Sequence, residues 1–548
     1  MSVSVKKNQV PTVAYFCMEF GLHPDFPIYS GGLGILAGDY LKAAYDQELP
    51  VVGVGILWRK GYTNQYINDA GRPYDVSQDY QRDFLKDTGV KVEVQIKNEP
   101  VICKVWMVDH FGNVPLYLLD VDLPENNESW LTHSLYRGSG DDRIAQEIIL
   151  GIGGVRALRA LGIEPDIYHF NEGHAVLAGI ELIGEKMKTG CSFTDALNQV
   201  RKNIVFTTHT PVPAGNEAHH HGALSYVGAY NGLNYEEMKR IGGDPFNMTV
   251  AGLRLSRITN AVASLHGETA KKMWAQVSEA APIISITNGV HQGTWQDSGI
   301  NRADRNSDDL WRAHMENKGR LLEKIRNVTG HTLNPEVMVI GFARRAATYK
   351  RGDLILRDRN RILPLLAEGK VQLVFSGKAH PQDEGGKDTV SRIISFARKF
   401  PQQVVFLQNY DMRLGQLLTR GCDIWLNNPV RPMEASGTSG MKAGMNGLMN
   451  LSTLDGWWAE GCRHSFNGWQ FGEGYEGPNQ DEHDLHALFE TLHHQVLPTY
   501  YNQRQLWLEM MSNSIEVATK QFSARRMVRE YYEKLYCAEN TSFQEISA

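Results

Sequence analysis

The sequence predicts an α/β protein in which two parallel-sheet domains face a central cleft. Three observations support this prediction: apolar runs of strand length alternate with longer helical segments, both halves of the chain show the alternation, and polar residues gather directly after the strands. At 548 residues and 42% hydrophobic content, the chain also exceeds what one core usually organises. We expect a first domain over residues 1–288 and a second over residues 289–520.

The first half contains three apolar segments that are typical of buried parallel strands. They cover residues 165–170, 203–209 and 282–288 and are rich in isoleucine, valine and phenylalanine. A helix over roughly 142–161 precedes them, and another over 173–187 follows the first strand. This alternation of strand and helix predicts a parallel sheet covered by helices.

The second half repeats the scheme. Strands are expected at residues 336–343, 371–376, 404–408 and 422–427, with helices between them, the first of which covers residues 354–369. A further helix is expected to begin at about residue 440. The two halves therefore predict two Rossmann-like domains, with the crossing between them near the start of the second.

Polar residues follow the predicted strands in both halves. Ligands of such sheets bind outside the carboxyl ends of the strands, so these residues are candidates for the lining of the cleft. They are Asn171, Glu172, His174, His209, Thr210, Asn288, Arg344, Arg345, Lys378, Tyr410 and Glu434. A purely structural α/β protein would not need so many polar groups at one end of its sheets.

Charge and cysteine content exclude several classes of partner. With 62 acidic and 56 basic residues and no long run of either sign, no nucleic-acid or membrane surface is expected. The six cysteines are scattered without a C-x-x-C pair, so free thiols in a reducing cytoplasm are expected. The N-terminus lacks the apolar core of a signal peptide, and no apolar stretch has spanning length.

The segment 343–353 places Arg344, Arg345, Lys350 and Arg351 where a strand turns into a helix. Arginine binds phosphate through paired hydrogen bonds, and a helix N-terminus adds oriented N–H groups. A solvated basic face is the commoner fate of such a charge run. The position at a strand's end makes the two interpretations about equally supported.

The glycine- and hydroxyl-rich loop 431–447 leads into a helix and carries Lys442 one turn into it. Backbone amides of such a loop can wrap an anion, while the lysine can form a Schiff base or neutralise a charge. The alternative is a tight turn with a surface lysine. The segment that begins at Glu434 and continues through Ala435, Ser436 and Gly437 offers groups that bind sugar hydroxyls.

Another glycine-rich loop, residues 29–39, precedes a helix. Its Gly31, Gly32 and Gly34 lack the final glycine of a dinucleotide fingerprint, so a nicotinamide site is not supported. Trp295 could stack on the ring of a sugar or cofactor, although core packing is the more frequent role of a tryptophan.

The histidines do not form a metal motif. His219, His220 and His221 are consecutive, and neighbours in sequence rarely reach one ion together, so we expect a solvated loop and no metal. His174 and His209 follow predicted strands and are candidates for the cleft. A buried, hydrogen-bonded histidine is the alternative interpretation for either.

Eight blocks between residues 29 and 447 occur together and in a distinctive order. They are YSGGLGILAGDYLKAA, FNEGHA, FTTHTPVPAG, TNGVHQGTW, FARRAATYKR, SGKAHP, FLQNYD and EASGTSGMKAGMNG. On these blocks the sequence resembles the α-glucan phosphorylase family, and DGWWAEG at 455–461 is similar to its short bacterial and archaeal branch. The resemblance implies the glycosyltransferase B architecture, with a C-terminal helix in residues 521–548 returning to the first domain.

The resemblance also implies roles for individual residues. Lys442 would hold pyridoxal 5'-phosphate through a Schiff base, and the residues implied around that cofactor are Arg344, Tyr410, Thr438, Ser439 and Trp295. Substrate phosphate would contact Arg345, Lys350 and the backbone at Gly32. The residues implied around the terminal glucose are Asn288, Tyr349, Glu434, Ala435, Ser436, Gly437 and His209. Lys442, Arg345, Lys350, Arg344 and His209 form the implied catalytic set.

The reaction implied is reversible phosphorolysis of the terminal α-1,4-linked glucose of glycogen, starch or maltodextrin. The product is α-glucose 1-phosphate with retained configuration, and the cofactor phosphate acts as a proton relay. The partners are an α-1,4-glucan and inorganic phosphate, and a homodimer is within the family's range. Only 28 residues precede Tyr29, so the long regulatory region of the animal enzymes and their allosteric control are not expected.

Four positions depart from the animal enzymes of the family. Arg344 stands for a lysine, Ala347 for a histidine and Ser439 for a glycine, while Arg257 lies where a sugar-pocket histidine is expected. Ala347 and Arg257 put the details of glucose recognition in question. Two other functions stay open: a nucleotide-sugar α-glucan synthase of the same fold, and a non-catalytic glucan-binding protein. The SGTSGMK segment with its lysine disfavours the synthase, and intact Lys442, Arg345, Lys350 and Glu434 disfavour the non-catalytic protein.

Overall fold

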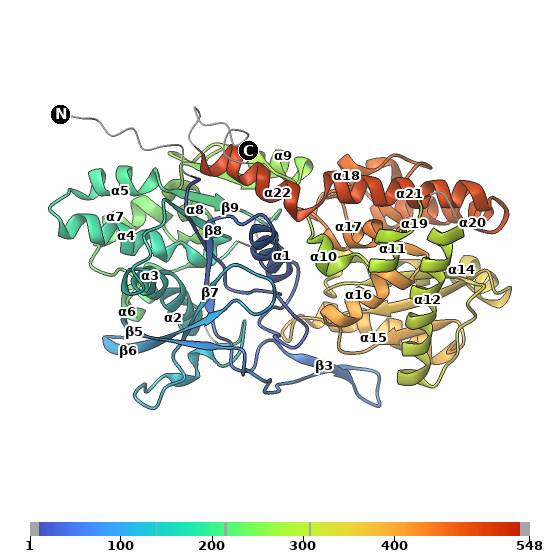
Figure 1. Ribbon diagram of the computed structural model, residues 1–548, viewed down its shortest axis with the longest axis horizontal. Helices are drawn as coiled ribbons and strands as arrows, with labels where there is room; N and C mark the ends of the chain where they lie inside the picture. The colour runs from blue at the N-terminus through green and yellow to red at the C-terminus, as the bar shows by residue number, and fades with distance from the viewer. Residues whose placement is uncertain (1–9, 139, 213–215, 306–307, 538–548) are drawn as a thin grey trace.

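The computed structural model describes residues 10–138, 140–212, 216–305 and 308–537. It contains a nine-stranded sheet in the first half of the chain and a six-stranded sheet in the second half (Figure 1). The predicted α/β class with large parallel sheets is confirmed. Within the described ranges, no helix has both the length and the apolar content needed to cross a membrane.

The first sheet has the strand order β13-β12-β9-β8-β1-β2-β7-β6-β5. Its strands are β1 (Val13–Phe16), β2 (Val51–Ile56), β5 (Lys86–Ile96), β6 (Glu99–Val108), β7 (Leu116–Asp120), β8 (Ile167–Asn171), β9 (Ile204–Thr207), β12 (Ile258–Ala261) and β13 (Ile283–Ser285). Pairing is parallel from β13 to β7, whereas β6 and β5 add an antiparallel edge that the sequence analysis did not predict. The order reverses between β1 and β8, which is where such sheets bind ligands.

The second sheet has the order β16-β15-β14-β17-β18-β19, and its pairs are parallel. Its strands are β14 (Met338–Ala343), β15 (Val371–Ser376), β16 (Val404–Leu407), β17 (Ile424–Asn427), β18 (Met449–Thr453) and β19 (Gly468–Phe471). This is the strand order of a doubly wound dinucleotide-binding sheet, and it reverses between β14 and β17. The strands predicted in the second half are confirmed.

Helices cover the sheets in both halves. In the first half they are α1 (Gly32–Asp46), α2 (Gly140–Ile148), α3 (Gly154–Ala160), α4 (Leu177–Lys188), α5 (Phe193–Arg201), α6 (His221–Val227), α7 (Tyr235–Gly242), α8 (Met248–Leu255) and α9 (Ser264–Met273). The helix predicted at 142–161 is α2 and α3 joined by a π-helical turn, Ile149–Gly153.

The remaining helices follow the first sheet and alternate with strands of the second. They are α10 (Gln292–Trp295), α11 (Ser298–Arg302), α12 (Asp308–Thr329), α13 (Leu354–Arg357), α14 (Arg359–Ala367), α15 (Glu384–Lys399), α16 (Met412–Gly421), α17 (Thr438–Met445), α18 (Trp458–Gly461), α19 (Gln480–Thr491), α20 (Leu497–Asn502), α21 (Arg504–Gln521) and α22 (Ala524–Tyr531). One helix was expected from residue 354 onward, but Asp358 leaves the helical conformation and its carboxylate caps the N–H of Arg361. The segment therefore forms two helices, α13 and α14.

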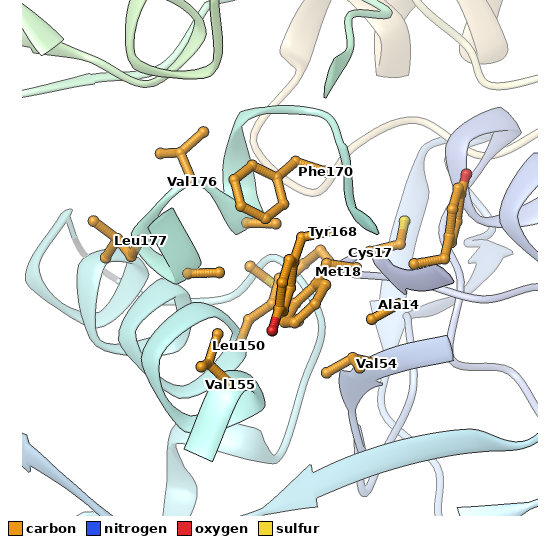
Figure 2. Packing of buried hydrophobic residues seen from close by; sticks show 14 of the residues in the cluster. Ala14, Cys17, Met18, Val54, Leu150, Val155, Tyr168, Phe170, Val176 and Leu177 are labelled. Carbon is orange, nitrogen blue, oxygen red and sulfur yellow. The ribbon is translucent and has the colours of Figure 1, made fainter. Parts of the chain in front are cut away.

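The core of the first half packs the α2–α3 layer against the middle of the sheet. Figure 2 shows side chains of this cluster, including Ala14, Val54, Tyr168 and Phe170 from strands and Leu150 and Val155 from the helical layer. The approach is close at Gly154, where an added Cβ would lie 2.7 Å from a ring carbon of Phe16. Each large side chain buried here contributes about 1.5–3 kcal/mol. The strand ends that carry polar loops are thereby held on a rigid base.

The C-terminal segment packs against the first half. α22 and the turn after it, Tyr532–Tyr536, belong to the same hydrophobic cluster as β1 and β8. The hydroxyl of Tyr536 lies 2.9 Å from the hydroxyl of Tyr40 on α1 and 2.6 Å from Nδ1 of His169 on β8. Residues 524–536 thus tie the second half back to the first sheet (Figure 1).

A second connection between the halves comes from the hairpin β3 (Asn64–Ile67) and β4 (Pro73–Val76), which reaches toward the second half in Figure 1. The side chain of Gln65 donates to the carbonyl of Ala379 and accepts from its N–H, at 3.0 and 2.9 Å. Arg72 forms ion pairs with Glu384 and Asp388 on α15. The hairpin and the C-terminal segment therefore connect the two halves of the chain at two separate places.

Candidate active site

A cavity of about 810 Å³ lies between the ends of the two sheets, and loops of both halves line it. The structure brings all the residues assigned by the family resemblance to this one cavity. They are Gly32, His209, Asn288, Trp295, Arg344, Arg345, Tyr349, Lys350, Tyr410, Glu434, Ala435, Ser436, Gly437, Thr438, Ser439 and Lys442.

Two cations of the second half meet the carboxylate of Glu434. Arg344 follows β14, and its Nη2 donates to Glu434 at 2.5 Å, while Nζ of Lys350 donates at 2.9 Å. Burial alone would raise the pKa of Glu434, but the two cations outweigh it and lower that pKa to about 2. The backbone N–H of Glu434 donates to the carboxylate of Asp455 at 2.9 Å. With its lowered pKa, the Glu434 side chain is ionised at neutral pH.

Arg345 differs from Arg344 in having no fixed partner. Its side chain is exposed to the cavity and forms no hydrogen bond or ion pair with any described residue. In Arg344, Nε and Nη1 are also buried without a hydrogen-bond partner in the described part of the chain. Buried guanidinium N–H groups are costly to leave unpaired, so this corner of the cavity favours an anionic ligand.

Lys442 lies on α17, behind the glycine-rich loop. Gly437 caps this helix with a left-handed backbone conformation (φ 82°), which a residue with a side chain rarely adopts. The Nζ of Lys442 lies 3.7 Å from the ring centroid of Trp295, whose indole N–H donates to the carboxylate of Asp39 at 2.9 Å. Burial lowers the pKa of Lys442 to about 8, although Asp39 opposes the shift. About a tenth of the amine is then neutral and nucleophilic at pH 7, far more than for a lysine with an ordinary pKa.

The N-terminus of α1 opens into the cavity. The helix has no side-chain cap, and the N–H groups of Gly32 and Leu33 have no acceptor among the described residues. An added Cβ at Gly31 or Gly32 would meet nothing within 4 Å. Packing does not explain these two glycines, whereas close approach of an anion to the backbone does.

His209 is held in a neutral, oriented state. Its Nε2 lies 2.6 Å from Oδ1 of Asn171, and its backbone N–H donates to Glu172 at 2.8 Å. Burial lowers the pKa of His209 to about 3, so the imidazole is uncharged at neutral pH. The sequence left open whether His209 is a cleft residue or a buried, hydrogen-bonded one. The structure supports both interpretations, because His209 is hydrogen-bonded and also lines the cavity.

Glu172 carries backbone strain beside His209. It adopts φ 76° and ψ 169°, a region that is essentially restricted to glycine. Burial raises the pKa of its carboxyl to about 7, while the N–H groups of His209 and Gly173 oppose the shift. Such strain persists only where the surrounding structure holds it, and it is concentrated at functional sites.

The expectation of a solvated loop at the three consecutive histidines is wrong for two of them. His219 is buried with its Nε2 3.1 Å from Glu147, and His221 is buried with its Nε2 2.7 Å from the carbonyl of Gly243. Both are pulled inward because they find polar partners from distant segments. Glu147, Glu217 and His219 lie close enough to share an ion, but the guanidinium of Arg143 already contacts both carboxylates, at 3.5 and 3.2 Å.

Two positions that had raised doubt about sugar recognition do not line the cavity. The guanidinium of Arg257 donates to the carbonyls of Lys202, Leu535 and Tyr536, so it anchors the C-terminal segment. The expectation that position 257 belongs to the sugar pocket is therefore wrong. Ala347 precedes the turn that carries Lys350 and is likewise absent from the lining.

Several lining or supporting residues were not singled out from the sequence. They are Glu19, Asp39, Tyr62, Tyr136, Arg143 and Asp455. Glu19 follows β1 and carried the same strand-end signal as the other candidates. Asp39 lies inside a helix, where no sequence pattern distinguishes it.

Two largely parallel sheets, and between their strand ends a cavity lined by cations and a buried lysine, define the molecule as an α/β protein with an enzyme-like site. A model of the carbohydrate phosphorylase family matches residues 300–464. The maltodextrin phosphorylase of Thermococcus litoralis is 39% identical over 98% of this chain and 71% of its own length. The glycogen phosphorylase of Aquifex aeolicus is 34% identical over 96% of this chain and 86% of its own length. The chain belongs to the α-glucan phosphorylase family.

Proposed function

We propose that this protein uses inorganic phosphate to release α-glucose 1-phosphate from the end of an α-1,4-glucan, reversibly and with retention of configuration. The observation that carries the proposal is the combination of an uncommitted guanidinium, Arg345, with the open N-terminus of α1 in one cavity. These groups suit a phosphate that must enter and leave. Relatives named maltodextrin phosphorylase and glycogen phosphorylase support the substrate class.

The residues around Lys442 fit pyridoxal phosphate. A buried lysine with a lowered pKa suits covalent attachment to an aldehyde, and the unpaired Nε and Nη1 of Arg344 suit a phosphate group. We propose that Lys442 holds the cofactor beside Trp295, and that Arg344, Tyr410, Thr438 and Ser439 bind its phosphate. When bound, the cofactor supplies a phosphate group that exchanges a proton with the substrate phosphate.

The chain's own residues bind and orient the reactants in this scheme. Arg345, Lys350 and the N–H of Gly32 hold the substrate phosphate, and Lys350 must then share its charge between Glu434 and the ligand. The terminal glucose binds Glu434, Asn288, Tyr349, His209 and the loop Ala435, Ser436 and Gly437. Because His209 is neutral, it serves as a hydrogen-bond partner and adds no charge to the pocket. Enclosure between the two sheets limits water, which favours phosphate as the acceptor.

We further propose that the two halves are the facing domains of a glycosyltransferase B architecture, divided at residues 1–288 and 289–520. The expected C-terminal segment 521–548 returns to the first domain through its residues up to 537, and residues 538–548 lie outside the described part of the chain. The contacts of α22 and of the turn after it with α1 and β8 support that division. The six free cysteines support a reducing cytoplasmic location. A homodimer is compatible with this scheme.

The test is glucose 1-phosphate formation by purified protein supplied with pyridoxal phosphate, maltodextrin and orthophosphate. Product that requires orthophosphate is the expected result. A parallel reaction with ADP-glucose tests the synthase alternative, which predicts chain extension without added cofactor. Folded protein that binds cofactor and glucan but gives no phosphate-dependent product would favour a non-catalytic glucan-binding role.

A further inference from the structure

Glu19 is a buried carboxylate at the reversal point of the first sheet, directly after β1, and the scheme above assigns it no role. Only 2% of its surface is exposed, although it borders the cavity. Its Oε2 accepts the N–H of Ser30 at 2.5 Å and that of Gly31 at 3.2 Å. Its Oε1 accepts the hydroxyls of Ser30 and Tyr136 at 3.2 and 2.8 Å. Both oxygens are therefore fully used by hydrogen-bond donors, most of them from the glycine-rich loop.

The glycines of that loop divide into two groups by what surrounds them. An added Cβ at Gly34 would lie 2.6 Å from Oε2 of Glu19, so glycine is required there for the carboxylate to approach. At Gly31 and Gly32 an added Cβ would meet nothing within 4 Å. The loop is thus closed on the side of Glu19 and open on the side of the cavity.

The pattern of hydrogen bonds has a consequence for the backbone. Glu19 takes the N–H groups of Ser30 and Gly31, while those of Gly32 and Leu33, the next two in the chain, have no acceptor among the described residues. Helix N-termini bind anions through such groups, provided the loop before them holds its conformation. A carboxylate that fixes two amides therefore sets the direction of the next two.

We infer that Glu19 is a positioning residue for phosphate: it holds the loop before α1 so that the N–H groups of Gly32 and Leu33 receive the substrate phosphate together with Arg345. This inference rests on the proposed function. In this inference Glu19 acts through the loop, whose Ser30 and Gly31 it contacts directly. Its own support comes from Tyr136, over whose ring the guanidinium of Arg143 lies at 4.9 Å. Arg143 also pairs with Glu147 and Glu217, so a chain of contacts links these two carboxylates through Tyr136 to Glu19.

The experiment measures the KM for orthophosphate and the KM for maltodextrin separately, using the cofactor-loaded Glu19→Ala and Glu19→Gln proteins. For Glu19→Ala we expect the phosphate KM to rise about 10- to 100-fold, because two amides lose their acceptor and the loop is released. The maltodextrin KM should change less than about twofold. Glu19→Gln keeps one carbonyl oxygen for the two amides and should raise the phosphate KM only about threefold.

A matched control is Glu181→Ala, which removes an equally buried carboxylate from the same half of the chain. Glu181 is 4% exposed, binds Arg156 at 2.9 Å through each oxygen and does not line the cavity. We expect a comparable loss of Tm with an unchanged phosphate KM. The inference is overturned if Glu19→Ala raises both KM values equally, or lowers the Tm while leaving the phosphate KM unchanged.

Calorimetric binding of orthophosphate to the same loaded proteins separates this inference from the proposed function. If the wild type binds phosphate but releases no glucose 1-phosphate, the proposed reaction fails, and a weaker phosphate affinity of Glu19→Ala still supports the positioning role. If the wild type turns over and Glu19→Ala binds phosphate equally well, the positioning role alone fails. Absence of phosphate binding to the wild type would overturn both.

Discussion

The two sides of the cavity differ in charge. The first side, formed by lining residues between Glu19 and Asn288, carries three acidic and two basic residues, whereas the second, between Ala343 and Lys442, carries two acidic and five basic ones. Burial also leaves His209 and His174 of the first side neutral, because it lowers the pKa of each to about 3. The second side attracts anions, and the first side offers amides and neutral hydrogen-bond partners.

This difference suits the proposed binding of both a phosphate and a sugar in one cavity. Cations gather at the reversal point of the second sheet, between β14 and β17, where Glu434 offsets part of their charge. The reversal point of the first sheet carries Glu19 and Glu172, which hold a loop and a histidine in place. Under the proposed function, charge on one side and fixed geometry on the other would contribute to different parts of ligand recognition.

The largest effect is expected from Lys442→Ala on the charged side. The variant should lose bound pyridoxal phosphate, and phosphate-dependent turnover should fall by at least about 10³-fold. The visible absorption spectrum of the purified protein and glucose 1-phosphate release are the measurements. Lys378→Ala is a matched control, because burial also lowers the pKa of Lys378 to about 8 but its Nζ donates to the carbonyl of Thr63. It should retain the cofactor; full activity of Lys442→Ala without cofactor would contradict the assignment.

Arg345→Ala removes the uncommitted guanidinium and should lower kcat/KM for orthophosphate by about 100- to 1000-fold. Arg345→Lys should recover only part of the loss, since an ammonium keeps the charge without the paired N–H groups. Steady-state kinetics at fixed glucan concentration measure the effect of both variants on kcat/KM for orthophosphate.

The contrast between the two sides of the cavity predicts the reverse for His209→Gln. This variant should raise the KM for glucan more than the KM for phosphate. If Arg345→Ala and His209→Gln each changed the KM for glucan and the KM for phosphate equally, the proposed difference between the two sides of the cavity would be wrong.

A smaller effect concerns Glu434 and acid stability. Its folded pKa of about 2 lies below the ordinary value of 4.5, so its ionised form stabilises the fold above pH 4.5, and this contribution is lost as the pH falls toward 2. The stability difference between wild type and Glu434→Gln should therefore narrow by about 1 kcal/mol between pH 6 and pH 3.5. Urea unfolding in phosphate-free buffer measures it. A difference that widens as the pH falls would show that the cations do not stabilise the carboxylate.

The smallest effect on activity is expected from Arg257→Gln, which lies on neither side of the cavity. Losing its bonds to the carbonyls of Leu535 and Tyr536 should destabilise the C-terminal segment by about 1–3 kcal/mol and lower the Tm. The KM for glucan should change less than about twofold. Thermal unfolding and glucan kinetics check both parts. A large rise in the glucan KM without a change in Tm would return Arg257 to sugar recognition.

Much of this architecture could be predicted because it rests on local patterns. Apolar runs identified the strands β8, β9 and β14 to β17, and the strand-end rule selected Arg344, Arg345 and Glu434. The antiparallel edge β5–β6 was missed, and the helix after residue 354 was expected to be continuous. Strand and helix periodicity reports which face is buried, but it does not report where one polar side chain such as Asp358 caps the next turn.

The amino-acid sequence by itself determined the fold class, the two sheets, and the loops in which Lys442 and Arg345 would be found. Tertiary structure decided which groups those residues meet: Glu434 pairs with Arg344 across 90 positions, and Trp295 donates to Asp39 across 256. It also decided that His219 is buried and that Arg257 holds the C-terminal segment. The physical reason is that apolar periodicity repeats along the chain, whereas each polar contact joins single residues brought together only by the packing of whole sheets.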